Sequence, residues 1–238
     1  MGGELMDDAP NTAMVLAAGF GTRMGALTAD RPKPLLTVGG KTLLDRALDE
    51  CAAAGVSRAV VNLHYLGDMI RKALHERVMP AIVFSEETEI LETGGGVANA
   101  SPLLGEAPFF TMNADAVWTG MRPLPQLSSD WRDGIDALLL LAPVERAIGY
   151  TRAGDFFAGD DGGLTRRGDK ARAPYVYTGA QIIRPEAFAD APDGAFSLNV
   201  IWDRLIAEGR IGAVVHDGEW VDVGTPDGLC LAERAVSA

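Results

Sequence analysis

The 238-residue sequence contains only two cysteines and three histidines. Cys51 and Cys230 match no CxxC spacing, so the sequence indicates neither a disulfide framework nor a zinc or redox motif. We expect both to be buried free thiols in a reduced, cytoplasmic protein. His64, His75 and His216 are widely spaced, so zinc binding and histidine-based catalysis have no support and we expect structural roles for all three.

Positive charge is also scarce, because 21 Lys and Arg stand against 33 Asp and Glu, for a net charge of −12. A protein that binds polymeric nucleic acid needs a basic face to neutralise phosphates, and this chain lacks that surplus. The longest apolar run, residues 137–144, is too short for a membrane span, which takes about 20 residues. Residues 1–12 have neither a cationic start nor an apolar segment, so they do not resemble a signal peptide. We therefore expect a cytoplasmic protein without nucleic-acid or membrane partners.

Short apolar runs alternate with amphipathic segments. The run Ala13–Ala18 is typical of a strand buried on both faces. Further strands are predicted at residues 58–64, 81–85, 108–113, 135–141, 175–183 and 211–216. Helices are predicted at residues 42–54, 66–77 and 197–208, from 226 to near 236, and as a short segment 97–100 that is entered through the glycines 94–96. This alternation predicts an α/β fold with a mostly parallel sheet flanked by helices, with residues 1–12 as a flexible tail and 13–238 as a single domain.

Local signals mark several helix ends. Thr42 with Asp45 three residues later has the pattern of a capping box, and Gly55 is placed to end that helix. Ser197 is the expected N-cap of a later helix. Thr225-Pro226 combines an N-cap residue with proline at the first helical position.

The first predicted strand leads directly into the glycine turn Gly19-Phe20-Gly21-Thr22-Arg23. Glycine permits φ > 0 and close backbone approach, so successive N–H groups can converge on an anion. The turn follows the carboxyl end of a strand, where ligands bind in open α/β sheets. It is neither a Walker A loop nor a dinucleotide-binding fingerprint, because Met24 occupies the third glycine position and no acid lies about 20 residues on at a strand end. A tight turn without a ligand remains the alternative.

A second segment, Arg31-Pro32-Lys33-Pro34, follows closely. Its prolines restrict the backbone around Lys33 and exclude a helix there. Arg23, Arg31 and Lys33 thus concentrate positive charge in an acidic chain, which suits a polyphosphate ligand. An ordinary exposed lysine is the alternative.

Together these two segments resemble the signature of sugar-1-phosphate nucleotidyltransferases, and LAAG before the first and PLLTVGGKTLLD after the second agree with it. The resemblance continues in the same order to Asp115 in TMNAD and to Asp222 in WVDVGTP. It implies the Rossmann-like nucleotide-diphospho-sugar transferase fold. It also implies the reaction of an NTP with a sugar 1-phosphate to give an NDP-sugar and pyrophosphate.

Within that family, the segment LETGGG at 91–96 and the short chain most resemble the N-acetylmuramate-1-phosphate uridylyltransferases of peptidoglycan recycling, which use UTP. Mannose-1-phosphate guanylyltransferases, which use GTP, have nearly the same N-terminal motifs and are the alternative. An inactive nucleotide-sensing relative is disfavoured, because Arg23, Lys33, Asp115 and Asp222 are all present. The chain shows no hexapeptide repeats, so we expect one activity, in a monomer or small homo-oligomer.

The resemblance also assigns site residues. Arg23 would hold the departing pyrophosphate, Lys33 the α-phosphate or the incoming phosphate, and Asp115 and Asp222 a Mg²⁺ ion. Mg²⁺ usually takes one or two carboxylates and completes its shell with phosphate oxygens and water, although either aspartate alone would pass for a cap or turn residue. The expected nucleotide contacts are Leu16, Ala17, Gly19, Gly21, Thr22, Arg23, Lys33, Glu92, Thr93, Gly94 and Asn113.

Glycines 94–96 would form a nucleobase loop, to which Glu87 or Glu92 adds an acceptor for a base N–H, and Asn113 would contact the nucleotide or its ribose. Asp155, Thr178 and Gly179 match family segments near the sugar. A basic cluster at Arg166, Arg167, Lys170 and Arg172 is either a solvated loop, the favoured interpretation, or a mobile phosphate clamp.

Overall fold

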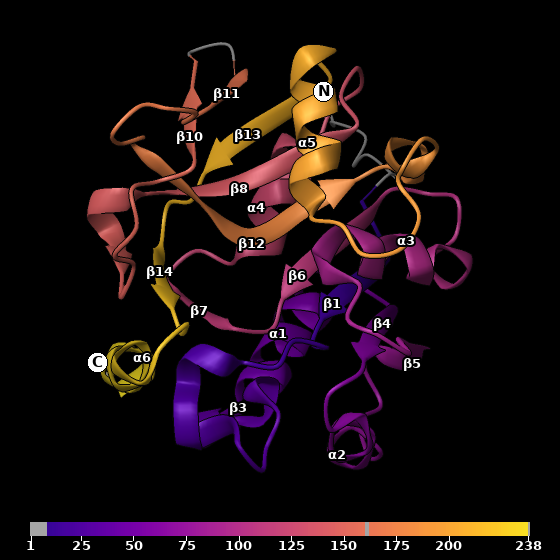
Figure 1. The fold of residues 1–238 in the computed structure, drawn as a ribbon, viewed down its shortest axis with the longest axis vertical. Coiled ribbons are helices and arrows are strands. Elements are labelled where there is room, and N and C mark those ends of the chain that lie inside the picture. Colours follow the sequence, from indigo (N-terminus) through magenta and orange to yellow (C-terminus); the bar gives the residue numbers. More distant parts are fainter. Residues whose placement is uncertain (1–8, 160–161, 238) are drawn as a thin grey trace, which may run out of the picture.

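The computed structural model describes residues 9–159 and 162–237, in which strands and helices alternate as predicted (Figure 1). The strands of the central row are β13 (Ile211–Val215), β8 (Ala137–Pro143), β12 (Tyr175–Ile183), β6 (Phe109–Asn113), β1 (Thr12–Leu16), β4 (Arg58–Leu63) and β5 (Ala81–Glu86), in that order. All pairs in this row are parallel except those of β12, which runs antiparallel to β6 and β8. The predicted mostly parallel α/β fold is confirmed.

Helices cover both faces of this sheet. The helices α1 (Leu43–Ala53), α2 (Gly67–Ala73) and α4 (Pro123–Asp130) pack on one face, and α3 (Glu92–Leu104) and α5 (Leu198–Ala207) on the other. Side chains alternate along a strand, so Ala13 and Val15 of β1 join the first core and Met14 joins the second. This double burial explains why the first strand is apolar throughout.

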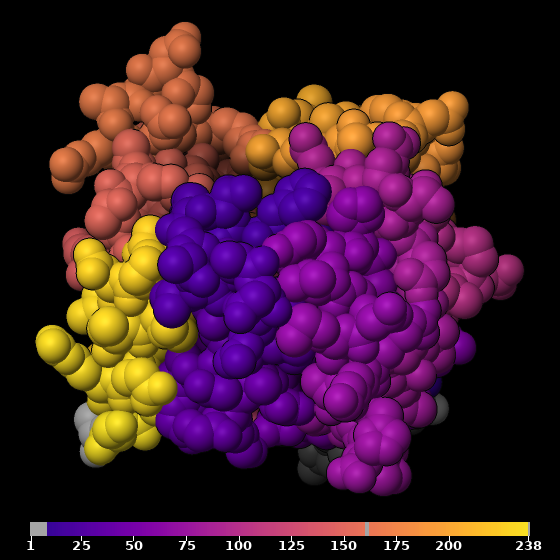
Figure 2. Space-filling view, turned by 60° about the horizontal axis from the view of Figure 1, so that its bottom comes forward, coloured from indigo at the N-terminus to yellow at the C-terminus, as the bar shows by residue number. Residues whose placement is uncertain are grey.

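A smaller sheet that the sequence pattern did not predict lies beside the main one. It consists of β7 (Ala116–Thr119), β14 (Glu219–Asp222) and β9 (Ala147–Ile148), and the C-terminal helix α6 (Pro226–Ser237) packs on it. Figure 2 shows that α6 lies directly against the N-terminal part of the chain. There the Gly39 N–H, in the turn between β2 (Thr37–Val38) and β3 (Lys41–Thr42), donates to Glu233 Oε2 at 2.9 Å. The C-terminal helix α6 thus packs beside the β2–β3 turn, although Gly39 and Glu233 are 194 residues apart in sequence.

The remaining elements are short. They are the strands β10 (Phe156–Ala158) and β11 (Leu164–Arg166), which lie at one corner of the molecule in Figure 1, and the 3₁₀ helices η1 (Thr22–Thr28), η2 (Lys33–Leu35), η3 (Val144–Arg146) and η4 (Pro185–Phe188).

The predicted helix caps are confirmed. Thr42 Oγ1 accepts from the Asp45 N–H at 2.9 Å, and Gly55 has φ 81° just past the helix end. Ser197 caps α5, and Thr225 Oγ1 accepts from the Gly228 N–H at 3.2 Å. Local hydrogen bonding specifies these ends, so the sequence alone locates them.

Several expectations were wrong in detail. The helix predicted at 66–77 ends at Ala73, and Cys230 is exposed on α6 whereas Cys51 is buried. The prolines beside Lys33 do not exclude a helix, because Pro34 sits in the first turn of the 3₁₀ helix η2, where no N–H is needed. The predicted tail, residues 1–12, ends too late. Thr12 begins β1, and the Asn11 carbonyl accepts from the Ser57 N–H at 2.8 Å; residues 1–8 lie outside the described range.

The glycine segment 94–96 is also not a loop. It forms part of α3, which extends from Glu92 to Leu104. A Cβ on Gly94 would overlap the Phe196 ring, and one on Gly95 would overlap the Gly194 carbonyl oxygen. These glycines therefore allow the helix to pack closely against the neighbouring segment. Glycine is needed here because it has no side chain, and not because its backbone is flexible.

Candidate active site

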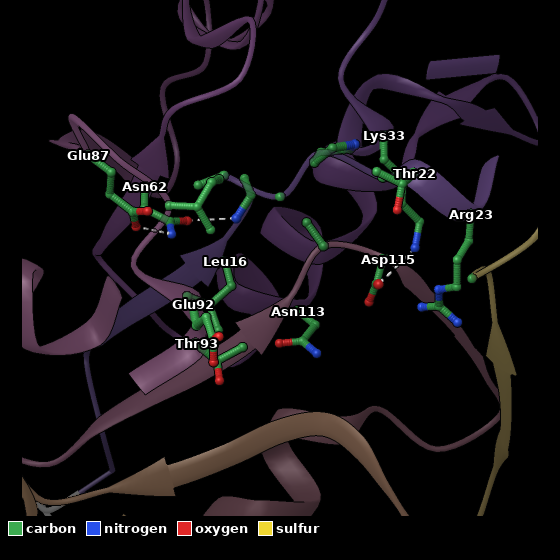
Figure 3. Close-up of a pocket in the computed structure, with 18 residues that line it drawn as sticks. Leu16, Thr22, Arg23, Lys33, Asn62, Glu87, Glu92, Thr93, Asn113 and Asp115 are labelled. Carbon is green, nitrogen blue, oxygen red and sulfur yellow. Dashed lines mark hydrogen bonds and ion pairs between the residues drawn. The ribbon is translucent and has the colours of Figure 1, made fainter. Parts of the chain in front are cut away.

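Two adjoining cavities form a cleft, and the first of them lies at the carboxyl ends of β1, β4, β5 and β6. The first has a volume of about 300 Å³ and the second about 340 Å³. They share the residues Arg23, Thr93, Asn113 and Asp115, so the cleft is continuous through this junction. Figure 3 shows the first cavity, with Lys33 and Asp115 facing each other on one side and Asn62 and Glu87 on the other. The cleft thus has two compartments, and a ligand pair or a two-part ligand could place one part in each.

The glycine turn after β1 is shaped to admit Lys33. Gly21 has φ 64°, and a Cβ there would lie 2.9 Å from Lys33 Cβ, so a larger residue would both strain the backbone and displace the lysine. The buried side chain of Met24 anchors the following η1 segment in an apolar cluster with Leu36 and Val223. The turn and the lysine therefore form one packed unit.

Lys33 is buried, in contrast to an ordinary surface lysine. Its Nζ lies 2.8 Å from Asp115 Oδ2, and its side chain is 9% exposed against 37% for Asp115. Burying an ammonium group requires a partner, and here the partner is a carboxylate at the junction of the two cavities. Arg31 is exposed and lines neither cavity.

Asp222, at the end of β14, stands next to Asp115 although the two are far apart in sequence. It pairs with Ala116 in the small sheet, and the Val223 N–H donates to the Asp115 carbonyl at 3.1 Å. Burial, and then the negative charge of Asp115, raise the pKa of the Asp222 carboxyl, while Arg152, Lys33 and Arg23 oppose that rise. Within the described residues, the Asp222 carboxylate has no hydrogen bond or ion pair.

This pair of acids fits a divalent cation. Two adjacent carboxylates repel each other, and a cation between them removes that cost. In the described part of the chain, no group of three or more His, Cys, Asp or Glu residues could hold a metal. Two protein carboxylates suit Mg²⁺, which keeps most of its positions for phosphate and water. Gly224 adjoins both Arg23 and Asp222, because a Cβ there would lie 2.8 Å from Arg23 Nη1 and from Asp222 Oδ1.

A buried amide–carboxylate bridge supports the far wall of the first cavity. Asn62 Oδ1 accepts from the Ala17 N–H at 2.7 Å, and its Nδ2 donates to Glu87 Oε1 at 2.6 Å. Glu87 Oε2 also accepts from the Leu91 N–H at 3.2 Å. Both carboxylate oxygens of Glu87 are thus already engaged within the protein, which argues against Glu87 as a free acceptor for a base. No role for Asn62 was predicted from the sequence. The one signal in the sequence is that this polar residue lies inside the apolar run RAVVNLH.

The start of α3 completes this wall. Glu92 has φ 59°, a left-handed conformation rare outside glycine that is often found at functional sites. Thr93 Oγ1 accepts from the Leu198 N–H at 3.0 Å, which ties α3 to α5. Gly94 does not line either cavity, and its N–H donates to the Phe196 carbonyl at 2.8 Å. Its expected contact with a nucleotide is therefore not supported by its position.

The other expected nucleotide-contacting residues do line the first cavity. They are Leu16, Ala17, Gly19, Gly21, Thr22, Arg23, Lys33, Glu92, Thr93 and Asn113. Sequence reasoning missed Ala18, Pro34, Ile90, Ala114 and Gly224, which also line it.

Asp155, Thr178 and Gly179, the expected sugar-binding residues, line the second cavity. Asp155 Oδ2 accepts from the Tyr177 N–H at 3.1 Å, whereas the buried Thr178 hydroxyl donates to the Leu140 carbonyl. Gly179 has φ 91°, and a Cβ there would lie 2.9 Å from Asn113 Cβ, so glycine lets Asn113 approach. Thr178 and Gly179 therefore contribute backbone groups and shape to the second cavity, and no side chain that is free to bind a ligand.

The predicted basic cluster does not act as one group. Arg166 lines the second cavity, whereas Arg167 Nε donates to the Gly154 carbonyl and Lys170 Nζ lies 4.2 Å from the Phe157 ring centroid. Arg172 is exposed and outside both cavities.

Comparison with known proteins places these features in one family. A family model described as a MobA-like NTP transferase domain matches residues 13–149. The chain belongs to this family of NTP transferases. This match, together with a relative that is 44% identical over 98% of this chain and acts on a sugar 1-phosphate, confirms the resemblance to sugar-1-phosphate nucleotidyltransferases, and the protein is a nucleotidyltransferase.

Individual relatives of this transferase extend the match beyond residue 149. An N-acetylmuramate alpha-1-phosphate uridylyltransferase of Caulobacter vibrioides is 44% identical, over 98% of this chain and 99% of the relative. A mannose-1-phosphate guanylyltransferase catalytic subunit beta of Xenopus tropicalis is 27% identical, over 94% of this chain and 65% of the relative. The solved structure of HddC from Yersinia pseudotuberculosis complexed with GMP-PN has a TM-score of 0.78 at 22% identity, covering 95% of this chain and 99% of the other. That last likeness concerns the fold.

None of the helices in the described parts of the chain is long and apolar enough to cross a bilayer.

Proposed function

We propose that this transferase moves the uridylyl group of UTP onto N-acetylmuramate 1-phosphate, releasing pyrophosphate and UDP-N-acetylmuramate. The observation that carries the proposal is the 44% identity to the Caulobacter uridylyltransferase over nearly the whole of both chains. The two-compartment cleft supports it, because the reaction must hold a nucleotide and a sugar phosphate side by side.

The proposed chemistry is an in-line displacement at the α-phosphorus. An oxygen of the sugar phosphate forms a bond to that phosphorus, and the bond to the pyrophosphate oxygen breaks. The nucleophile is already anionic, so no general base is required. Catalysis of phosphoryl transfer rests on positioning and electrostatic stabilisation, and the site supplies cationic groups rather than a proton acceptor.

Each charged residue has a proposed role. Arg23, at the junction beside Gly224, holds the departing pyrophosphate. Lys33 is aimed at the same junction by its packing against Gly21, and it neutralises the α-phosphate or the incoming phosphate. Its present partner, Asp115, must then share its charge with another cation.

That other cation is proposed to be Mg²⁺, which Asp115 and Asp222 would hold. When bound, Mg²⁺ neutralises charge on the phosphate oxygens at the reacting phosphorus. Burial, and then the repulsion from Asp115, raise the pKa of the Asp222 carboxyl, and both effects support a cation at this point.

The nucleotide is proposed to occupy the first cavity and the sugar the second. Asn113 touches both compartments and would contact the nucleotide or its ribose, while Glu92 and Thr93 would lie near the base. Asp155, with one oxygen held by the Tyr177 N–H, would accept from a sugar hydroxyl. The transferase would work in the cytoplasm on small anionic substrates, in the recycling of peptidoglycan sugars, as one domain from residue 13 to 238 and as a monomer or small homo-oligomer.

A pyrophosphate-release screen tests this proposal. Four NTPs are combined, with Mg²⁺, with the 1-phosphates of N-acetylmuramate, N-acetylglucosamine, mannose and glucose. We expect UTP with N-acetylmuramate 1-phosphate to give the highest kcat/KM. A higher value for GTP with mannose 1-phosphate would overturn the proposal in favour of the activity named for the Xenopus relative.

A further inference from the structure

The second cavity is lined by a cationic group that is separate from the charges around Asp222. Arg23 and Arg152 belong to the phosphate end, because their charges act on Asp222. Arg166 also lines the second cavity but not the first, and it stands on β11 beside α5. A sugar 1-phosphate whose phosphate lies at the junction would extend its ring past Gly179 toward this second charge.

Three contacts hold the Arg166 guanidinium in place. Its central carbon lies 4.9 Å from the Phe156 ring centroid and 5.6 Å from the Trp202 ring centroid, and its Nε lies 2.7 Å from Asp203 Oδ1. The arginine side chain is 26% exposed and Asp203 is 60% exposed. Stacking on rings and pairing through Nε restrict the plane of the guanidinium before a ligand arrives.

The opposite edge of this guanidinium is open. Neither terminal nitrogen of Arg166 forms a hydrogen bond with any residue in the ranges 9–159 and 162–237, whereas Arg167, its neighbour, uses Nε and Nη1 on backbone carbonyls. An arginine held through Nε presents its two terminal nitrogens as donors suited to a carboxylate. Phe156 and Trp202 provide an apolar wall beside it, which strengthens a charged contact by excluding water.

We propose that Arg166 binds the carboxylate of the lactyl ether on N-acetylmuramate 1-phosphate and is thereby the residue that distinguishes this sugar from N-acetylglucosamine 1-phosphate. This inference rests on the proposed function. The two sugars differ at one position, where the first has a carboxylate-bearing ether and the second a hydroxyl. With the second sugar, Arg166 loses an anionic partner in a partly desolvated site, and such a loss separates two substrates strongly.

Arg166→Met tests the inference, with Arg184→Met as a matched control. Arg184 also stacks on a tryptophan, with its central carbon 5.2 Å from the Trp131 ring centroid, and also pairs with an aspartate, Asp133. It lines neither cavity. In each protein, kcat and KM are measured with UTP for both sugar phosphates.

We expect Arg166→Met to lower kcat/KM for N-acetylmuramate 1-phosphate by about 10- to 100-fold, mainly through KM, as for the loss of a charged hydrogen bond. The value for N-acetylglucosamine 1-phosphate should change less than about threefold, so the preference collapses. Arg184→Met should keep the preference of the wild type. Equal losses for both sugars would show that Arg166 only supports Phe156 and Trp202, and would overturn the inference.

A change in the substrate tests the same contact without any variant. The methyl ester of the lactyl group removes the negative charge from N-acetylmuramate 1-phosphate. The wild type should lose about as much kcat/KM on the ester as Arg166→Met loses on the acid, and the variant should not discriminate acid from ester. If the wild type turns over acid and ester equally, the inference fails while the proposed function stands. If it uses neither N-acetylmuramate compound with UTP, the proposed function itself fails.

Discussion

The two compartments of the cleft are built in different ways. The nucleotide side comes mainly from the carboxyl ends of β1, β4, β5 and β6, and both of its cationic residues, Arg23 and Lys33, lie in the segment between β1 and β2. The sugar side is assembled from β10, β11, β12, β14 and the start of α5, which come together from distant parts of the chain. The first compartment is therefore a property of a local motif and the second a property of the packing of the C-terminal half. Substitutions on the two sides of the molecule test that contrast.

Lys33→Met should reduce kcat by about 10²- to 10³-fold, the usual effect of removing one preorganised group that stabilises transition-state charge. Lys33 is buried but Asp115 is partly exposed, so we expect the loss of the pair to cost only about 1 kcal/mol of folding free energy after solvent screening. Steady-state rates and urea denaturation measure the two effects. Lys41→Met, which breaks the exposed ion pair with Asp49, is the control and should leave kcat unchanged. A near-normal rate for Lys33→Met would remove Lys33 from the catalytic role.

Asp222→Asn tests the point where the two compartments meet. We expect kcat to fall by about 10²-fold and the Mg²⁺ concentration for half-maximal rate to rise, because one carboxylate ligand is lost. The folded state should not lose stability, since the variant removes the charge of a partly buried carboxylate that Asp115 repels. A Mg²⁺ titration of the rate, with a thermal melt beside it, gives both results. An unchanged Mg²⁺ dependence would contradict metal binding by Asp222.

Gly94→Ala and Gly19→Ala compare a packing glycine with a loop glycine on the nucleotide side. A Cβ added at Gly94 would overlap the Phe196 ring, and overpacking of this kind costs about 1–3 kcal/mol. A Cβ added at Gly19 has no neighbour within 4 Å and φ there is not positive, so Gly19→Ala should leave stability within about 0.5 kcal/mol. Denaturant midpoints decide the comparison. Equal midpoints for both variants would mean that α3 shifts to accept the methyl group.

The smallest expected effect concerns pH, on the C-terminal side. Burial, with a contribution from Arg146, lowers the pKa of His216, while Asp217 and the Glu219 backbone act in the opposite direction. The unfolded chain therefore binds a proton before the folded one does. Stability should fall as the pH drops below about 6.5, the ordinary value, and level off below the folded pKa.

His216→Gln should flatten this part of the stability curve, measured as denaturant midpoints across the pH range around the ordinary histidine pKa. His216 Nδ1 lies 2.9 Å from Gln126 Oε1, so the variant also changes a buried contact, and the comparison concerns the slope with pH rather than the absolute stability. An unchanged slope would show that other groups control it.

The fold was largely predictable because its signals are local. An apolar run such as that of β1 indicates a strand that is buried on two faces. Thr42, Gly55 and Ser197 mark helix ends, because capping depends on residues within one turn of the helix. The small sheet was missed because β7, β9 and β14 are two to four residues long and have no period that distinguishes them from loops.

In the site, the residues that meet at the junction could be named from the sequence: the glycine turn, Lys33 and the two aspartates, whose types and order match one family. How these groups are held depends on contacts between segments that are distant in sequence. It buried Lys33 against Asp115, enclosed glycines 94–96 in a helix against Phe196, and occupied both oxygens of Glu87 with Asn62 and Leu91.

The placement of Arg166 between Phe156, Trp202 and Asp203 was likewise a tertiary result. The difference arises because the interactions act over different ranges. Backbone preferences and caps act over about four residues, whereas burial and charge pairing depend on segments that meet only when the whole sheet has formed.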